Sequence, residues 1–158
     1  MATTRIKEKI RSSMHIPVFR LSLVKDHAIT YKNSSPVSTP EDVYKVLQQY
    51  LQDTDREHFV VVFLDAHCAV IGINTVSVGT LTESLVHPRE VFKGAILANA
   101  ASIICAHNHL TGIAQASEAD ISVTQKLKEA GRILVIPVED HVIVGEDRPF
   151  SFRQHGLL

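Results

Sequence analysis

The chain has 158 residues, of which 45% are hydrophobic and 21% are charged, a balance typical of a single soluble globular domain. The formal net charge of −1 gives no electrostatic reason to expect nucleic acid as a partner. The two cysteines are too few for a disulfide scaffold, so we expect a protein of the reducing cytoplasm. No leader peptide is expected, because charged residues between Arg5 and Arg11 interrupt any apolar core, and no membrane span is expected, because the longest weakly polar run, residues 95–106, is too short to cross a bilayer.

The first part of the chain predicts an N-terminal extension followed by a helix. Residues 1–37 are assigned to the extension, in which a polar start precedes a strand at residues 16–24, IPVFRLSLV, where apolar and polar side chains tend to alternate. Thr39 is a suitable N-cap and Pro40 a suitable first helical residue. The helix that they open has one apolar face, formed by Val43, Val46, Leu47, Tyr50 and Leu51.

A hairpin and a buried helix are expected next. The apolar run FVVVFLD, residues 59–65, predicts an interior strand, with residues 69–78 as its hairpin partner and Gly79 ending the pair. Pro88 begins a helix, PREVFKGAILANA, which is apolar on most sides and is therefore expected to be buried. This helix leads into a strand at residues 103–108.

The last part of the chain predicts one helix and two strands. The helix begins after Ser117 and is expected to end at Gly131. The strands are ILVIPV, residues 133–138, and DHVIVG, residues 140–145. Helices interleaved with a mixed sheet make an α/β fold the expected class.

Two histidines lie at the end of the strand predicted at residues 103–108. His107 and His109 are separated by one residue, so in an extended chain both side chains project from the same face and can share a metal ion. The pair alone is weak evidence, because 9 histidines in 158 residues give roughly 0.5 such pairs by chance. Its weight depends on the carboxylate that follows.

Asp120 supplies this carboxylate. Ser117 and Asp120 have the spacing of a capping box at the start of a helix. Asp120 also shares a helical stripe with residues that should face the protein, namely Val123, Thr124 and Leu127. A carboxylate in this place needs positive charge, which the helix dipole and a cation held by the two histidines would provide. The combination indicates a metal site.

The whole pattern resembles the JAMM (MPN-plus) metalloprotease signature, in which a glutamate far upstream is followed by H-x-H-x(7)-S-x-x-D. More narrowly it resembles the RadC family, historically described as DNA-repair proteins, whose HNHPSG run appears here as HNHLTG. Residues 56–65, 78–96, 140–145 and 151–156 are also similar to the family. The resemblance makes residues 38–158 a RadC-like domain. It implies a three-layer, cytidine-deaminase-like α/β fold, with a mixed sheet and helices on both faces.

The chain departs from the family pattern in the loop after the histidines. Leu110 and Ala116 stand where the family usually has prolines, and Thr111 where it usually has Ser. Without the prolines the φ angles of this loop are freer, so we expect a less rigid loop. Full-length RadC-like proteins carry a helical, DNA-binding-like segment upstream, for which the residues before Ser38 leave no room, so the chain resembles a short form.

The resemblance also implies the ligands of the site. His107, His109 and Asp120 would bind one zinc ion and leave a fourth position for water. Ser117 would direct its hydroxyl toward the substrate oxyanion.

Glu57 matches the upstream glutamate of the signature and would take a proton from the water as general base. A solvated glutamate at a strand end is the alternative interpretation of Glu57. Glu90 is the competing candidate for the base, although the dipole of its helix explains a carboxylate in the first turn.

Cys105 and His141 are further candidates beside the site. Cys105 shares the strand face of His107, which would allow a Cys-His-His site, but a buried inert thiol is commoner. His141 would lie near the metal or the substrate, or be an ordinary hydrogen-bonded histidine.

The sequence lacks H-E-x-x-H, H-x-E with P-C-x-x-C, and G-x-S-x-G, which argues against zincins, zinc deaminases and serine hydrolases with a nucleophile elbow.

Three functions are compatible with this pattern. The first is a zinc hydrolase that cleaves an amide of a peptide or isopeptide substrate. The second is an accessory protein of DNA repair or processing, as the historical family description suggests, although the charge balance argues against direct DNA contact. The third is a non-catalytic interaction module stabilised by a metal ion.

Overall fold

The computed structural model describes residues 16–30, 39–51, 54–79 and 86–158. These residues form α1 (Pro40–Tyr50), β1 (His58–Leu64), β2 (Val70–Val78), α2 (Pro88–Leu97), β3 (Ser102–Asn108), α3 (Glu118–Leu134), β4 (Val138–Val144) and β5 (Phe150–Ser151). The strands make one mixed sheet in the order β2-β1-β3-β4-β5, in which only the β3–β4 pair is parallel. No helix in the described parts of the chain is long and apolar enough to cross a membrane.

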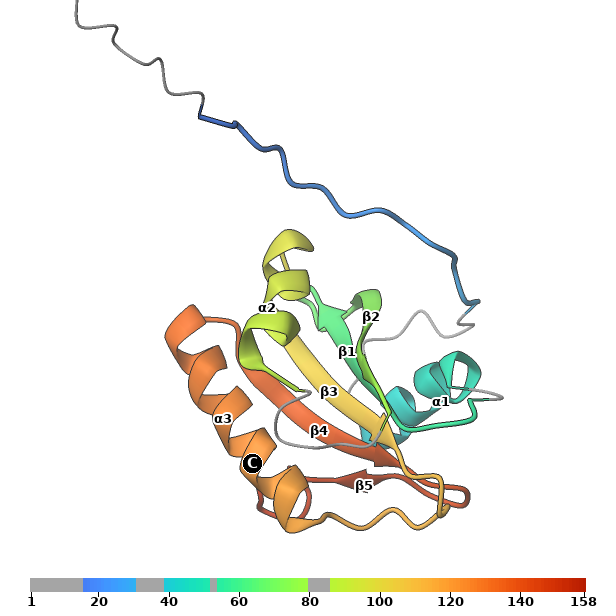
Figure 1. The fold of residues 1–158 in the computed structure, drawn as a ribbon. Coiled ribbons are helices and arrows are strands. Elements are labelled where there is room, and N and C mark those ends of the chain that lie inside the picture. Colours follow the sequence, from blue (N-terminus) through green and yellow to red (C-terminus); the bar gives the residue numbers. More distant parts are fainter. Residues whose placement is uncertain (1–15, 31–38, 52–53, 80–85) are drawn as a thin grey trace, which may run out of the picture.

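Each face of the sheet carries its own hydrophobic core. In β1, the side chains of Phe59, Val61 and Phe63 pack in the core that α2 and α3 cover. The alternate side chains of β1 pack with α1 on the opposite face. Figure 1 shows the sheet with α2 and α3 on one side and α1 on the other. The predicted three-layer α/β arrangement is therefore confirmed.

The helix starts agree with their sequence signals. Thr39 caps α1 by accepting from the backbone N–H of Asp42, and Pro40 is the first residue of the helix. The β1–β2 hairpin and the start of α2 at Pro88 also agree with prediction. Local hydrogen bonding and the fixed φ of proline are sufficient to define these positions.

The predicted end of α3 was wrong. Gly131 does not stop the helix, which continues to Leu134 and ends at Val135, a residue with a left-handed φ of 58°. A Cβ at position 131 would lie 2.6 Å from the carbonyl oxygen of Ile136, so glycine allows the returning chain to approach the helix closely. Residues 133–138 are therefore not a separate strand, and one strand, β4, replaces the two that were predicted.

Residues 16–24 are not a strand either. They are extended, and their large apolar side chains are exposed, including Val18 and Phe19. In Figure 1 residues 16–30 run as a blue trace that leads away from the sheet. Alternation predicts a strand only where another strand is available to pair with it, and none of the described strands pairs with this segment. The predicted domain boundary between residues 37 and 38 lies outside the described residues.

Candidate metal centre

The two predicted histidine ligands lie at the end of β3, in the middle of the sheet. His107 belongs to the strand and is completely buried, whereas His109 follows the strand and has 17% of its side chain exposed. Their Nε2 atoms are 2.9 Å apart. The alternation along the strand thus brings both rings to one face, as expected.

Asp120 reaches the same point from the first turn of α3. Its Oδ1 lies 3.3 Å from Nε2 of His107, and its Oδ2 lies 3.9 Å from Nε2 of His109. One ligand atom from each of the three residues lies within 4.8 Å of the others. The structure therefore brings together the three side chains that the sequence predicts as metal ligands.

Ser117 orients the Asp120 carboxylate. The backbone N–H and the hydroxyl of Ser117 donate to Oδ2 of Asp120 at 2.8 Å and 2.6 Å. The hydroxyl oxygen accepts in turn from the backbone N–H of Asp120 at 3.2 Å. This is the predicted capping box, and it leaves Oδ1 of Asp120 directed to His107.

The hydrogen bonding of His109 shows that the cluster suits a cation. Its Nδ1 lies 2.8 Å from the carbonyl oxygen of Ile113, which can only accept, so Nδ1 carries the ring hydrogen. The neutral ring then presents a bare lone pair on Nε2 to His107 and Asp120. A buried carboxylate beside such a lone pair requires positive charge, and two imidazoles with one carboxylate form a donor set that zinc accepts.

A proton on His107 does not provide this charge at neutral pH. Burial lowers the pKa of His107 to about 4, an effect that Asp120 opposes and that His109 reinforces. His107 is therefore neutral at pH 7, and the lone pair of one ring nitrogen is available without displacement of a proton.

Cys105, the alternative ligand, lies outside the cluster. It is buried among the apolar side chains of the core on the α3 side. The ligand group found in the described residues consists of His107, His109 and Asp120 alone.

Glu57 lies directly before β1, the antiparallel neighbour of β3. The register pairs Phe59 with His107, so an extension of this register places Glu57 level with His109 and on the same face of the sheet. The carbonyl oxygen of Glu57 accepts from the backbone N–H of Gly79 at 2.8 Å, which ties it to the end of β2.

Glu90, the competing candidate for the base, contacts cations on its own helix. It forms ion pairs with Lys93 and, at 3.5 Å, with Arg89. A hydrogen bond from Lys93, together with the charges of Lys93 and Arg89, lowers the pKa of Glu90. These contacts agree with the interpretation of Glu90 as a carboxylate that stabilises a helix start.

Asn108 is a residue whose role the sequence analysis missed. It lies between the two histidines, and its side chain is directed to the opposite face of β3. Its Oδ1 accepts from the N–H of His58 at 2.7 Å, and its Nδ2 donates to the carbonyl oxygen of Arg56 at 3.2 Å. These two bonds flank Glu57 on both sides. Side chains alternate along a strand, so the position of Asn108 between His107 and His109 was the signal that its side chain points to the other face.

A comparison with protein families agrees with this geometry. The family model described as a RadC-like JAB domain matches residues 37–157. The chain belongs to the RadC family.

Relatives in the RadC family are similar over most of this chain. A UPF0758 protein of Rubrobacter xylanophilus is 50% identical over 139 residues, which are 87% of this chain and 61% of the relative. Similar proteins of Chlorobaculum parvum and Caldanaerobacter subterraneus are 49% and 48% identical over 75% and 76% of this chain, and 53% and 52% of their own length. The chain thus spans somewhat more than half the length of these relatives.

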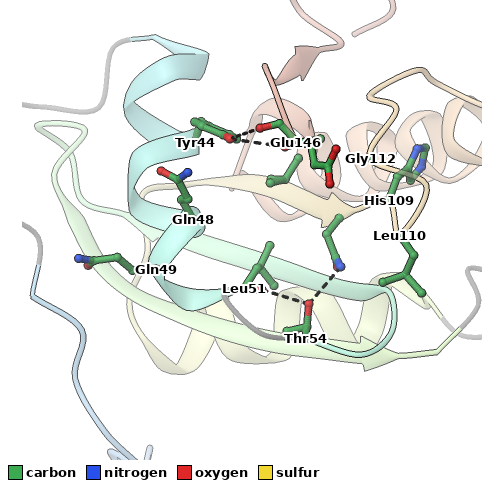
Figure 2. Close-up of a pocket in the computed structure, with 12 residues that line it drawn as sticks. Tyr44, Gln48, Gln49, Leu51, Thr54, His109, Leu110, Gly112 and Glu146 are labelled. Atoms are coloured by element: carbon green, nitrogen blue, oxygen red, sulfur yellow. Dashed lines mark hydrogen bonds between the residues drawn. The ribbon is translucent and has the colours of Figure 1, made fainter.

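A cavity of about 670 Å³ lies on the α1 side of this RadC domain, between α1 and the loops that follow β3 and β4. Figure 2 shows Gln48 and Gln49 of α1 across from Leu110, with His109 at the far end. Tyr44 donates to the carbonyl oxygen of Glu146 at 3.1 Å and so joins α1 to the loop after β4. His109 lines this cavity and also belongs to the cluster, so the two meet at this residue.

His141 lies against the cluster from β4. Its Nε2 is 2.9 Å from Nδ1 of His107. Burial, and then the neighbouring His107 and His109, holds the pKa of His141 well below its usual range. His141 was a candidate in the sequence analysis. Its contact with His107, however, depends on the pairing of β3 with β4, which no local sequence pattern predicts.

Proposed function

We propose that this RadC domain is a zinc-dependent hydrolase that cleaves an amide bond of a peptide or isopeptide substrate. His107, His109 and Asp120 would hold the metal ion. When bound, zinc lowers the pKa of a water molecule and polarises a carbonyl group. Membership of a family with a JAB domain supports this class of reaction.

One observation carries the proposal. Two imidazole Nε2 atoms and a buried carboxylate converge at the end of β3, and the ring hydrogen of His109 points away from that point. This arrangement presents lone pairs and negative charge to a single position. A group of three ligands with one partly exposed member, His109, supports a catalytic site with an open fourth position over a closed structural site.

The roles of the remaining residues follow from their positions. Glu57 would accept a proton from the attacking water and donate it to the leaving amine. The pairing of β1 with β3 supports this assignment over Glu90, whose carboxylate contacts Lys93 and Arg89. Ser117 is exposed beside Asp120, and its hydroxyl would turn from Oδ2 of Asp120 to donate to the oxyanion of the substrate, while its backbone N–H keeps its bond to Oδ2. The cavity beside His109 would receive part of the substrate.

The first test is the metal content of the purified protein. We expect about one zinc ion per chain by elemental analysis, because three ligands and a water complete the coordination of catalytic zinc. The His107→Ala/His109→Ala double variant should contain no bound zinc. Full zinc occupancy in this variant would contradict the proposed site.

The second test separates the base from the ligand. Glu57→Gln retains the shape and all three ligands, so it should retain zinc but lose about 10²-fold or more of the hydrolysis rate. Asp120→Asn should weaken zinc binding and hydrolysis together. Rates would be measured on a library of quenched fluorescent peptides and ε-lysine isopeptides.

Glu90→Gln is the matched control, because among the described residues its carboxylate forms ion pairs with Arg89 and Lys93 of its own helix. It should hydrolyse at the parental rate. If Glu90→Gln were inactive and Glu57→Gln fully active, the assignment of the base would be wrong.

A further inference from the structure

His107 contacts a chain of buried polar groups that leads away from the metal cluster. Its Nδ1 lies 2.9 Å from Nε2 of His141, and Nδ1 of His141 lies 2.6 Å from the hydroxyl oxygen of Thr124. This hydroxyl lies 2.6 Å from the backbone carbonyl oxygen of Asp120. This series of hydrogen bonds therefore begins at one candidate ligand, His107, and ends on the backbone of another, Asp120.

The last acceptor determines the direction of every hydrogen bond in this chain. A carbonyl oxygen can only accept, so Thr124 donates its single hydroxyl hydrogen to Asp120. The oxygen of Thr124 can then only accept from His141, which places the ring hydrogen of neutral His141 on Nδ1. Nε2 of His141 is consequently bare and accepts from Nδ1–H of His107. Neutral His107 is left with a bare Nε2, directed to His109 and Asp120.

The opposite arrangement would leave polar atoms without partners. With its hydrogen on Nε2, His141 would present a bare Nδ1 to a hydroxyl oxygen that has already donated its hydrogen. His107 would then carry its own hydrogen on Nε2 and would have no lone pair for a metal ion. Because His107, Thr124 and His141 are all buried, water does not readily compensate for such a mismatch.

We propose that His141 and Thr124 are positioning residues that hold His107 with its hydrogen on Nδ1, so that Nε2 is free to bind the metal ion. This role rests on the proposed metal site. A hydrogen bond to the second nitrogen of a ligating histidine also fixes the orientation of the ring. Here a second histidine accepts this bond, and a threonine on the helix of Asp120 determines which of its nitrogens can accept.

The first measurement needs no variant and no metal. Long-range ¹H–¹⁵N correlation spectra of the metal-free protein at pH 7 report which nitrogen of each imidazole carries hydrogen. We expect His107 and His141 both to be in the Nδ1–H form. A spectrum with the hydrogen of His107 on Nε2 would overturn the proposal, whether or not the protein binds zinc.

The second measurement uses matched pairs of variants. Thr124→Val keeps the shape of the side chain without the hydroxyl, and Thr124→Ser keeps the hydroxyl. His141→Met removes both ring nitrogens, whereas His141→Gln can still accept from His107 and donate to Thr124. Zinc affinity would be measured by competition with a chelator at pH 7.

Thr124→Val and His141→Met should weaken zinc binding about 10- to 100-fold. Thr124→Ser and His141→Gln should stay within a few-fold of the parental affinity. Unchanged affinity and an unchanged His107 spectrum in Thr124→Val would overturn the proposal. If the parental protein showed the expected spectrum but bound no zinc, the proposed function would fail while the hydrogen-bond arrangement stood.

Discussion

Cys105 shows how the surroundings of a residue decide its chemistry. It lies two residues before His107 on the same face of β3, a position from which a thiolate would be a plausible ligand. Burial, and then the nearby charge of Asp140, raises the pKa of the Cys105 thiol to about 12. A thiol must lose its proton to bind a metal ion, so this site disfavours Cys105 as a ligand.

The two cysteines should therefore react differently with iodoacetamide. Cys68 is exposed and Cys105 is buried, so in the folded protein at pH 8 we expect alkylation of Cys68 alone. Peptide mass spectrometry would locate the modification. A Cys68→Ser variant should remain unmodified until it is denatured, and rapid labelling of Cys105 in the folded variant would contradict its placement in the core.

Local patterns were sufficient to identify the three candidate ligands. Alternation along one strand relates His107 to His109, and the capping box determines the direction of Asp120. The hydrogen bonds from His107 through His141 to Thr124 could not be predicted in this way. They join side chains 34 and 17 residues apart in sequence, and they depend on the parallel pairing of β3 with β4 and on the packing of α3.

At the scale of elements, the loop after β3 is held against the loop after β4. The N–H of His109 donates to the carbonyl oxygen of Val144 at 3.2 Å, and the N–H of Glu146 donates to that of Gly112 at 3.0 Å. The carbonyl oxygen of Ile113 then accepts from the His109 ring. The loop therefore has defined attachments even without the family's prolines.

A side chain at Gly145 should disturb these attachments. A Cβ there would lie 2.7 Å from the carbonyl oxygen of Gly112 and 2.9 Å from Cβ of Ala114, so Gly145→Ala must displace the loop. We expect a loss of about 1–3 kcal/mol in the free energy of unfolding, together with weaker zinc binding because the Ile113 carbonyl shifts from His109. Denaturant unfolding and chelator competition measure the two effects.

Gly72→Ala serves as the control for this prediction. Its Cβ would make an ordinary contact of 3.4 Å with Phe63, on a strand remote from the loop. Zinc affinity should be unchanged in this variant. Equal affinities in both variants would mean that the loop does not hold His109 through Ile113.

The element boundaries that the sequence missed are those set by distant contacts. The β-branched run after Gly131 favours a strand, but the structure keeps Ile133 and Leu134 in the helix and turns the chain only at Val135. The N–H of Ile136 then bonds to the carbonyl oxygen of Gly131 at 3.0 Å. Such a close return depends on the core that receives Ile136, which no window of sequence reveals.

At the scale of the whole molecule, the candidate metal centre links a central strand to a covering helix. His107 and His109 come from β3 and its end, and Asp120 comes from α3. A ligand that binds only the folded state adds about 2.7 kcal/mol of stability when its free concentration is 100 times its Kd. Metal binding should therefore stabilise the packing of α3 on the sheet.

Removal of the metal should lower the thermal stability of the protein. For a chain of this size, a loss of that order corresponds to a decrease of about 5–10 °C in Tm. Differential scanning calorimetry with and without a chelator would measure it, and added zinc should restore the original Tm. The His109→Ala variant should show a much smaller response, and a parental Tm that ignores both chelator and zinc would exclude this coupling.

The two bonds from Asn108 that flank Glu57 have a consequence for how sequences of this kind can change. The two candidate histidine ligands lie on β3 and directly after it, and the proposed base, Glu57, directly precedes the paired strand β1. The spacing of these three residues therefore follows the pleat of the sheet. Insertions near the cavity should therefore leave the distance between Glu57 and the two histidines unchanged. A deletion of one residue within β1 or β3, by contrast, would turn Glu57 or the two histidines to the opposite face of the sheet. We expect selection against such a deletion even where the protein still folds.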